Sequence, residues 1–266
     1  MDVLSFDFMQ NALAAGLLAS LICGVIGTLV VVNRIVFISG GIAHASYGGV
    51  GLAFLLGLPV LPVTAAFTVC MALIMALVTL HARERVDTVI GVIWAAGMAL
   101  GIILLDLTPG YNVDLMSYLF GSILAVPRSD LWIMAAMAAV VAVMVLVFYR
   151  GFTVMSFDEE FARSRGVPVD FLYILLIVMV GLCVVMIIRV VGLILVIALL
   201  TIPPFIAERR TRSLKVMMLV STLLSALFTV TGLFFSYALD LTSGASIIAV
   251  AAIGFFVSLL IPQKNT

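Results

Sequence analysis

The residue best suited to chemistry within this apolar chain is His44, ten residues after Arg34. Ionisable side chains at membrane depth usually face a protein interior or a water-filled path. Imidazole is also a common ligand of zinc and other first-row transition metals. Ten helical residues span about 15 Å, so an Arg34 at one membrane surface places the imidazole near the middle of the bilayer. We predict that His44 is a transient metal ligand on a cation pathway, with Tyr47 as a weaker candidate. The alternative is a neutral histidine that hydrogen-bonds neighbouring helices.

Small residues flank His44 on both sides. Ser39-Gly40-Gly41 precedes it and can interrupt a helix, exposing backbone carbonyl oxygens as the discontinuous helices of transporters do. Gly48, Gly49 and Gly51 follow it and permit the close approach of another helix. We therefore expect backbone oxygens beside the imidazole and tight helix packing just after it.

A second polar segment covers residues 156–168 and reads Ser-Phe-Asp-Glu-Glu-Phe-Ala-Arg-Ser-Arg-Gly-Val-Pro. Ser156 or Asp158 can cap a short helix here, with acidic residues in its first turn, arginines in its last turn and a glycine to end it. Such a helix, carrying Phe157 and Phe161, suits docking into a soluble partner. The alternative is an interfacial helix that rests on lipid headgroups, which the acidic cluster disfavours because anionic lipids repel it.

The motifs of several enzyme classes do not occur in this sequence. It holds no GxxxxGK[ST], no HExxH and no GxSxG, and its histidines number two. We therefore expect a chain that is not an enzyme and that cradles no nucleotide phosphates itself. No stripe of basic and aromatic residues indicates nucleic acid.

The elements that must position these residues are hydrophobic helices. The composition is 65% hydrophobic and 10% charged, whereas soluble domains are near half apolar and a quarter charged. About 20 apolar residues cross a bilayer, and backbone groups in hydrocarbon must be satisfied within a helix. We predict an all-α integral membrane protein with a single polytopic domain, residues 1–266. The runs free of Asp, Glu, Lys and Arg are 8–33, 35–82, 88–105, 131–149, 171–188, 190–207, 216–239 and 241–263.

One of these runs, residues 35–82, is long enough for two helices and carries a turn signal at Gly57-Leu58-Pro59. Dividing it gives about nine transmembrane helices. The stretch 115–127 is uncharged but too short to cross, so we predict a re-entrant or surface helix there. With the N-terminus outside and the C-terminus cytoplasmic, every basic residue except Arg128 and Arg189 falls on the cytoplasmic side.

Three segments together resemble the permease family of ABC importers for zinc, manganese and ferrous iron. They are residues 34–51 around His44, the Phe-Asp-Glu-Glu-Phe-Ala-Arg-Ser-Arg-Gly of 157–166, and the Val-Gly-Leu-Ile-Leu-Val-Ile-Ala-Leu-Leu-Thr-Ile-Pro-Pro of 191–204 with Leu-Thr-Ser-Gly-Ala-Ser at 241–246. The resemblance covers nearly the whole chain.

The resemblance implies a permease homodimer in the inner cell membrane of a prokaryote. A dimer of cytosolic ATPases would power it, and an extracellular or periplasmic metal-binding protein would supply the metal. No cofactor would be bound permanently. It also implies that residues 157–166 form the coupling helix on the ATPase, with contacts from Phe157, Asp158, Glu159, Phe161 and Gly166.

This chain departs from the family pattern at Gly40. Where the family commonly reads Gly-Asp-Ala-Leu-Ser-His, this sequence reads Ser-Gly-Gly-Ile-Ala-His, so a carboxylate that would contact the metal is missing. We expect import of a divalent transition metal (zinc, manganese or iron) driven by a separate ATPase. The alternatives are a secondary transporter or channel for a small cation, and an ABC permease for a chelated metal. The first is disfavoured because no Asp or Glu lies deep within a predicted span, where proton relays usually need one.

Overall fold

The computed structural model describes residues 6–81, 85–109 and 123–261, and across these ranges the regular structure is helical, with no strand. The chain is thus an all-helical membrane protein. Its helices are α1 (Asp7–Val32), α2 (Val36–Ala45), α3 (Tyr47–Leu56), α4 (Val60–His81), α5 (Val86–Asp106), the 3-10 turn η3 (Ile123–Ala125), α7 (Arg128–Val147), α8 (Tyr149–Phe157), α9 (Glu159–Ser164), α10 (Val169–Val191), α11 (Leu193–Glu208), α12 (Leu214–Leu239) and α13 (Ser243–Leu260).

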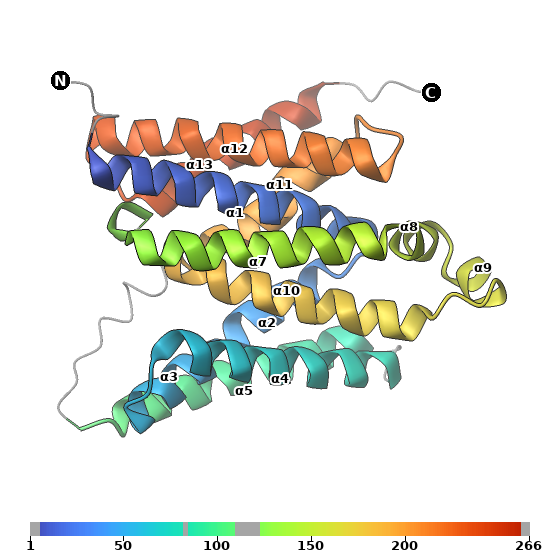
Figure 1. Cartoon of the computed structure of the whole chain (residues 1–266), viewed down its shortest axis with the longest axis horizontal. Helices are drawn as coiled ribbons and strands as arrows, with labels where there is room; N and C mark the ends of the chain where they lie inside the picture. Colours follow the sequence, from blue (N-terminus) through green and yellow to red (C-terminus); the bar gives the residue numbers. More distant parts are fainter. Residues whose placement is uncertain (1–5, 82–84, 110–122, 262–266) are drawn as a thin grey trace.

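The long helices lie side by side along one direction (Figure 1). Helix α1 packs against α11, α12 and α7, while α3, α4 and α5 pack on one another at the other side of the bundle. Helix α2 lies between these two groups and contacts α4, α5, α10 and α11. The sequence segment that holds His44 is therefore at the centre of the bundle.

Seven of the described helices are long and apolar enough to cross a membrane, namely α1, α4, α5, α7, α10, α12 and α13. The prediction of about nine such helices is not confirmed, because two of the predicted spans have another form. The first part of the run 35–82 is divided at Ser46 into α2 and α3, of ten residues each. The run 190–207 forms α11, which has 16 residues because Gly192, at φ +82°, separates it from α10.

The helix predicted at 115–127 lies mostly in residues 110–122, outside the described residues. Its last part contains η3.

Glycines bring α3 and α5 into backbone contact. A Cβ atom on Gly51 would lie 2.4 Å from the carbonyl oxygen of Gly101, and one on Gly101 would lie 2.5 Å from the carbonyl oxygen of Tyr47. A side chain at either position would therefore force the two helices apart. The close packing predicted from the glycines after His44 is confirmed.

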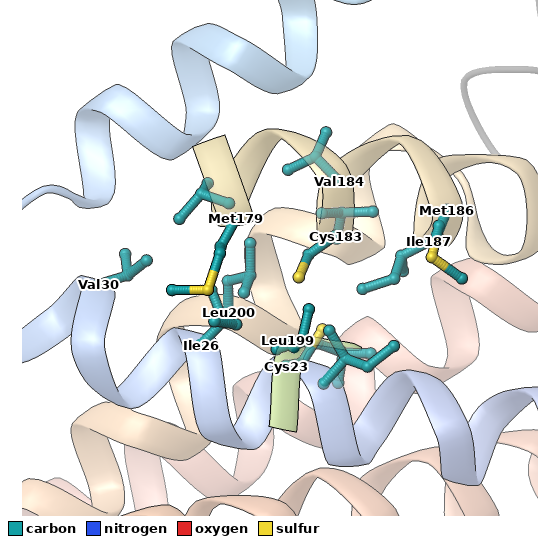
Figure 2. Packing of buried hydrophobic residues seen from close by; sticks show 14 of the residues in the cluster. Cys23, Ile26, Val30, Met179, Cys183, Val184, Met186, Ile187, Leu199 and Leu200 are labelled. Atoms are coloured by element: carbon teal, nitrogen blue, oxygen red, sulfur yellow. The ribbon is translucent and has the colours of Figure 1, made fainter. Parts of the chain in front are cut away.

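The core forms where α1, α10 and α11 meet (Figure 2). Cys23 of α1 and Cys183 of α10 are buried there beside Leu199 of α11, whereas Cys70 of α4 is exposed. This apolar contact holds together the helices α10 and α11, on which α2 packs.

Candidate functional site

The local form of α2 differs from the sequence prediction. Ser39, Gly40 and Gly41 lie within the continuous helix α2, so the predicted break at these residues is wrong. Gly41 instead makes room for α5, since a Cβ there would lie 2.6 Å from Cγ2 of Ile90. The helix is interrupted at Ser46, two residues after His44.

His44 lies in the last turn of α2 and contacts two residues of α5. Its ring stacks on Trp94, with 4.1 Å between ring centroids and 17° between the planes. Its Nδ1 lies 3.2 Å from Sδ of Met98, and the indole Nε1–H of Trp94 donates to the same sulfur at 3.3 Å. We call these three residues the His44 cluster.

The ring of His44 is held in place by its two contacts with α5. Trp94 and Met98 are four residues apart on α5, so they project from one face of that helix. Contacts to Trp94 and Met98 fix the imidazole plane and occupy Nδ1. The structure records no hydrogen-bond partner for Nε2 among the described residues. The half-buried imidazole is therefore held in one orientation.

An open groove runs along the same face of α2, which we call the α2 groove. Gly40 lines it and lies four residues before His44, on the same side of the helix. A Cβ on Gly40 would meet only Cδ1 of Ile197, at 3.8 Å, so a larger side chain fits there. The groove has a volume of about 720 Å³, and its other lining residues are Val31, Arg34, Val36, Phe37, Trp94, Ile197, Phe205 and Glu208.

Tyr47, the weaker sequence candidate, lies in a different environment. It is 4% exposed and begins α3, where its carbonyl oxygen faces Gly101 of α5. Like His44 and Met98, it is not among the residues that line the α2 groove, whose nearest contributions are Gly40 and Trp94. The structure therefore brings His44 and Gly40 together on one face and places Tyr47 in the α3–α5 packing.

The described residues contain no group of three or more His, Cys, Asp or Glu side chains able to hold a metal ion. A cation at His44 would thus rely on few ligands from this chain. Sequence reasoning missed Trp94 and Met98, because an apolar span contains many such residues and only the packing of α2 on α5 singles out these two.

The polar segment 156–168 forms two elements and not one helix. Phe157 is the last residue of α8, and Asp158 caps α9 by accepting a hydrogen bond from the backbone N–H of Phe161 at 2.8 Å. Asp158, not Ser156, is therefore the cap. The two phenylalanines are 68% and 53% exposed, which leaves them available to a partner.

Ion pairs and a glycine turn tie α9 to the start of α10. Arg163 pairs with Glu159 at 3.0 Å and with Asp170 of α10. The hydrogen bond to Asp170, and to a lesser extent the one to Glu159, raises the pKa of Arg163 above its ordinary value. Gly166 ends α9 at φ +75°, a left-handed conformation that suits glycine. The segment is exposed, so each ion pair contributes little stability.

A cavity of about 270 Å³ lies between α9 and the start of α2. Glu159 and Arg163 line it from α9, and Arg34 and Ile38 line it from the α2 side. The polar segment therefore borders the same helix that carries His44.

Known proteins resemble this chain over nearly its whole length. Residues 5–262 match the family model described as the ABC 3 transport family. An uncharacterized membrane protein of Synechocystis sp. is 48% identical over 97% of this chain and 92% of its own length. A manganese transport system membrane protein, MntC, of Halalkalibacterium halodurans is 34% identical over 97% of this chain and 89% of its own.

The fold matches as well. The structure of PsaBC from Streptococcus pneumoniae in complex with Fab contains a chain with a TM-score of 0.88 and 33% identity, and the match covers 98% of this chain and 94% of that one. Family model, sequence and fold agree with the resemblance drawn from the three motif segments. The chain belongs to the ABC 3 transport family.

Proposed function

We propose that this chain is the membrane-spanning subunit of an ABC importer that moves a divalent transition metal into the cell, powered by ATP hydrolysis on a separate subunit. The observation that carries the proposal is the His44 cluster, an oriented imidazole at the centre of the bundle beside an open groove. The family membership and the relatives named for manganese transport support it. Imidazole nitrogen is a suitable ligand for zinc and iron among the divalent transition metals.

His44 acts in this proposal as a stepping ligand. A metal ion that leaves water needs replacement ligands part-way across, and it must leave them again on the far side. One imidazole, helped by water, binds weakly enough for release. Gly40 contributes no carboxylate, which weakens the site further.

The proposed topology has nine crossings, with the N-terminus outside and the C-terminus cytoplasmic. Helices α2 and α3 together hold 20 residues, about 30 Å of helix and enough for one crossing, and α11 supplies another. Arg34, Asp87 and Arg163 line the cavity under α9 at one end of the bundle. At the same end, the ammonium group of Lys215 lies 5.1 Å from the ring centroid of Tyr149. The concentration of basic residues there favours a cytoplasmic location, in the inner membrane of a prokaryote.

Cysteine labelling from outside the cell tests this orientation. In a variant without Cys23, Cys70 and Cys183, we expect Asp240→Cys to react and Glu160→Cys and Arg212→Cys to remain protected. Strong external labelling at position 160 would place α9 outside and contradict the proposal.

Helix α9 is the proposed docking point for the ATPase. Phe157, Asp158, Glu159, Phe161 and Gly166 present two exposed rings, a cap and a fixed turn at the end of the bundle. The proposed assembly is a homodimer of this chain with an ATPase dimer, and an extracellular or periplasmic metal-binding protein supplies the cargo.

The test of the energy source uses the isolated chain and the complete complex. We expect the isolated chain to hydrolyse no ATP, and metal uptake by the reconstituted complex to require ATP on the ATPase side. Uptake by the chain alone, driven by a proton or ion gradient, would instead support a secondary transporter. Uptake of a chelated metal without uptake of the free ion would support the chelate alternative.

A further inference from the structure

Met98 links the two other members of the His44 cluster through its sulfur atom. Its sulfur is the one atom contacted by both other members of the His44 cluster, Nδ1 of His44 at 3.2 Å and Nε1 of Trp94 at 3.3 Å. A thioether has two lone pairs and no proton to donate. The indole occupies one lone pair, and the other points to the imidazole.

The spacing of this nitrogen and sulfur suits a shared metal ion. With a metal–nitrogen bond of about 2.1 Å and, as a lower bound for a thioether, the zinc–thiolate bond of about 2.3 Å, atoms 3.2 Å apart subtend an angle of about 93° at the metal. The tetrahedral angle requires about 3.6 Å between them, using the same bond lengths. A shift of a few tenths of an ångström by a flexible methionine therefore suffices.

We propose that Met98 is a metal ligand and that, with His44, it selects borderline-soft cations over hard ones. This inference rests on the proposed metal transport. The cation takes the place of the proton between Nδ1 and sulfur, and the imidazole carries its proton on Nε2 instead. The ligand stays neutral, and no net proton is released.

The chemistry of the site decides the class of cargo. Thioether and imidazole ligands favour zinc-like cations, whereas carboxylate and carbonyl oxygens favour manganese and magnesium. The charged residues that line the α2 groove are Arg34 and Glu208, and both lie at helix ends away from the last turn of α2. At Gly40, one turn from His44, no carboxylate is present although space for one exists. Within the part of the chain that the structure describes, the site therefore offers nitrogen and sulfur and no carboxylate of the kind that manganese prefers.

X-ray absorption at the zinc edge tests whether Met98 is a ligand. The assembled complex is loaded with one zinc ion per permease in a Cys70→Ser background, which removes the exposed thiol. We expect nitrogen at about 2.0 Å and a sulfur scatterer beyond the roughly 2.3 Å of a zinc–thiolate bond, and loss of the sulfur in Met98→Leu. The matched control is Met134→Leu, which removes a buried methionine sulfur from α7 and should change nothing. A zinc-edge spectrum of the wild-type complex that shows no sulfur neighbour would overturn the proposal, because a Met98 that only packs against the helices does not bind the metal.

The ratio of zinc to manganese uptake tests the selectivity. We expect Met98→Leu to lower this ratio at least about tenfold, because even outer-shell partners of metal ligands are worth 10- to 100-fold in affinity. Met98→Cys retains a sulfur atom, and we expect it to keep most of the preference for zinc over manganese. This variant provides the test if Met98→Leu fails to assemble. An unchanged ratio in Met98→Leu would overturn the inference while leaving metal transport intact. Absence of ATP-dependent uptake of either metal in the wild type would instead contradict the proposed function.

Discussion

The His44 cluster and the α9 segment are organised in opposite ways. The first joins side chains from two helices that are 50 residues apart in sequence, through ring stacking and contacts to sulfur. The second is built from neighbours along the chain, through a cap at Asp158, ion pairs of Arg163 and a turn at Gly166. The first borders the α2 groove through Trp94, and the second is exposed at the end of the bundle.

This difference matches two kinds of recognition. A metal ion is recognised by a few atoms held at fixed distances, which requires rigid packing of one helix on another. A protein partner is recognised by exposed rings and a stable local shape. The two regions should therefore be separable by mutation, each change affecting one property and leaving the other intact.

The largest expected effect is on metal binding at His44. Substitution His44→Ala removes the imidazole, and we expect zinc affinity of the assembled complex to fall on the order of 100-fold, the upper range for losses around metal ligands. Equilibrium titration with zinc measures it. His81→Ala is the matched control, because His81 is exposed and its Nδ1 lies 2.7 Å from the carbonyl oxygen of Leu77 in its own helix. If His44→Gln binds zinc as the wild type does, His44 is a packing residue.

The next largest effect is on association with the ATPase. Phe161→Ala removes an exposed ring at the proposed contact, and loss of such an anchor typically costs about 2 kcal/mol or more, about 30-fold in affinity. Gly166→Asp adds strain of about 1–2 kcal/mol at φ +75°. Co-purification and titration with the ATPase measure both changes. Phe234→Ala on α12 is the control, since that ring is also exposed but lies on a different helix. Equal losses in the control would show that α9 is not the docking point.

A change at Gly40 should sharpen the comparison by adding a hard ligand to the first region alone. Gly40→Asp places a carboxylate one turn from His44, where the groove has space. We expect manganese affinity to rise several-fold, about 1 kcal/mol, relative to zinc. Gly40→Asn has the same size without the charge and should give a smaller change. A manganese affinity unchanged in Gly40→Asp would show that this face of α2 does not approach the cargo.

The smallest expected effect comes from the cap of α9. Asp158→Ala should cost about 1 kcal/mol of local helix stability. We expect faster amide exchange in α9 and a several-fold weaker ATPase affinity, with zinc binding unaltered. Asp158→Asn preserves a capping oxygen and is the control. Weakened zinc binding in Asp158→Ala would mean that the two regions are not independent.

The sequence predicted the α9 segment better than the His44 cluster, and the reason is physical. Capping and helix ends depend on residues within a few positions of each other, so the acidic start and glycine end of α9 could be read from the chain. Even in this segment, the sequence did not show that Phe157 belongs to α8. The contacts of His44 depend on how α5 packs on α2, which no local pattern encodes, and so Trp94 and Met98 were missed.

The predicted number of membrane-spanning helices and the predicted break in α2 differ from the structure for related reasons. Hydropathy shows that a run can lie in a membrane, but it does not show where a helix is interrupted. Gly40 and Gly41 are ambiguous in sequence because glycine serves both helix breaks and close helix contacts. In this fold Gly41 serves the contact with Ile90, and the interruption falls at Ser46.

The central claim is that His44 lies on the path of the transported metal, and zinc and manganese flux per assembled complex tests it most directly. The measurement uses proteoliposomes that hold the permease with its ATPase, with ATP supplied on the ATPase side and complex content quantified for each variant. The account predicts that His44→Ala retains the bound ATPase but loses nearly all ATP-dependent uptake, while His81→Ala transports as the wild type does. Near-normal flux in His44→Ala at equal complex content would contradict it.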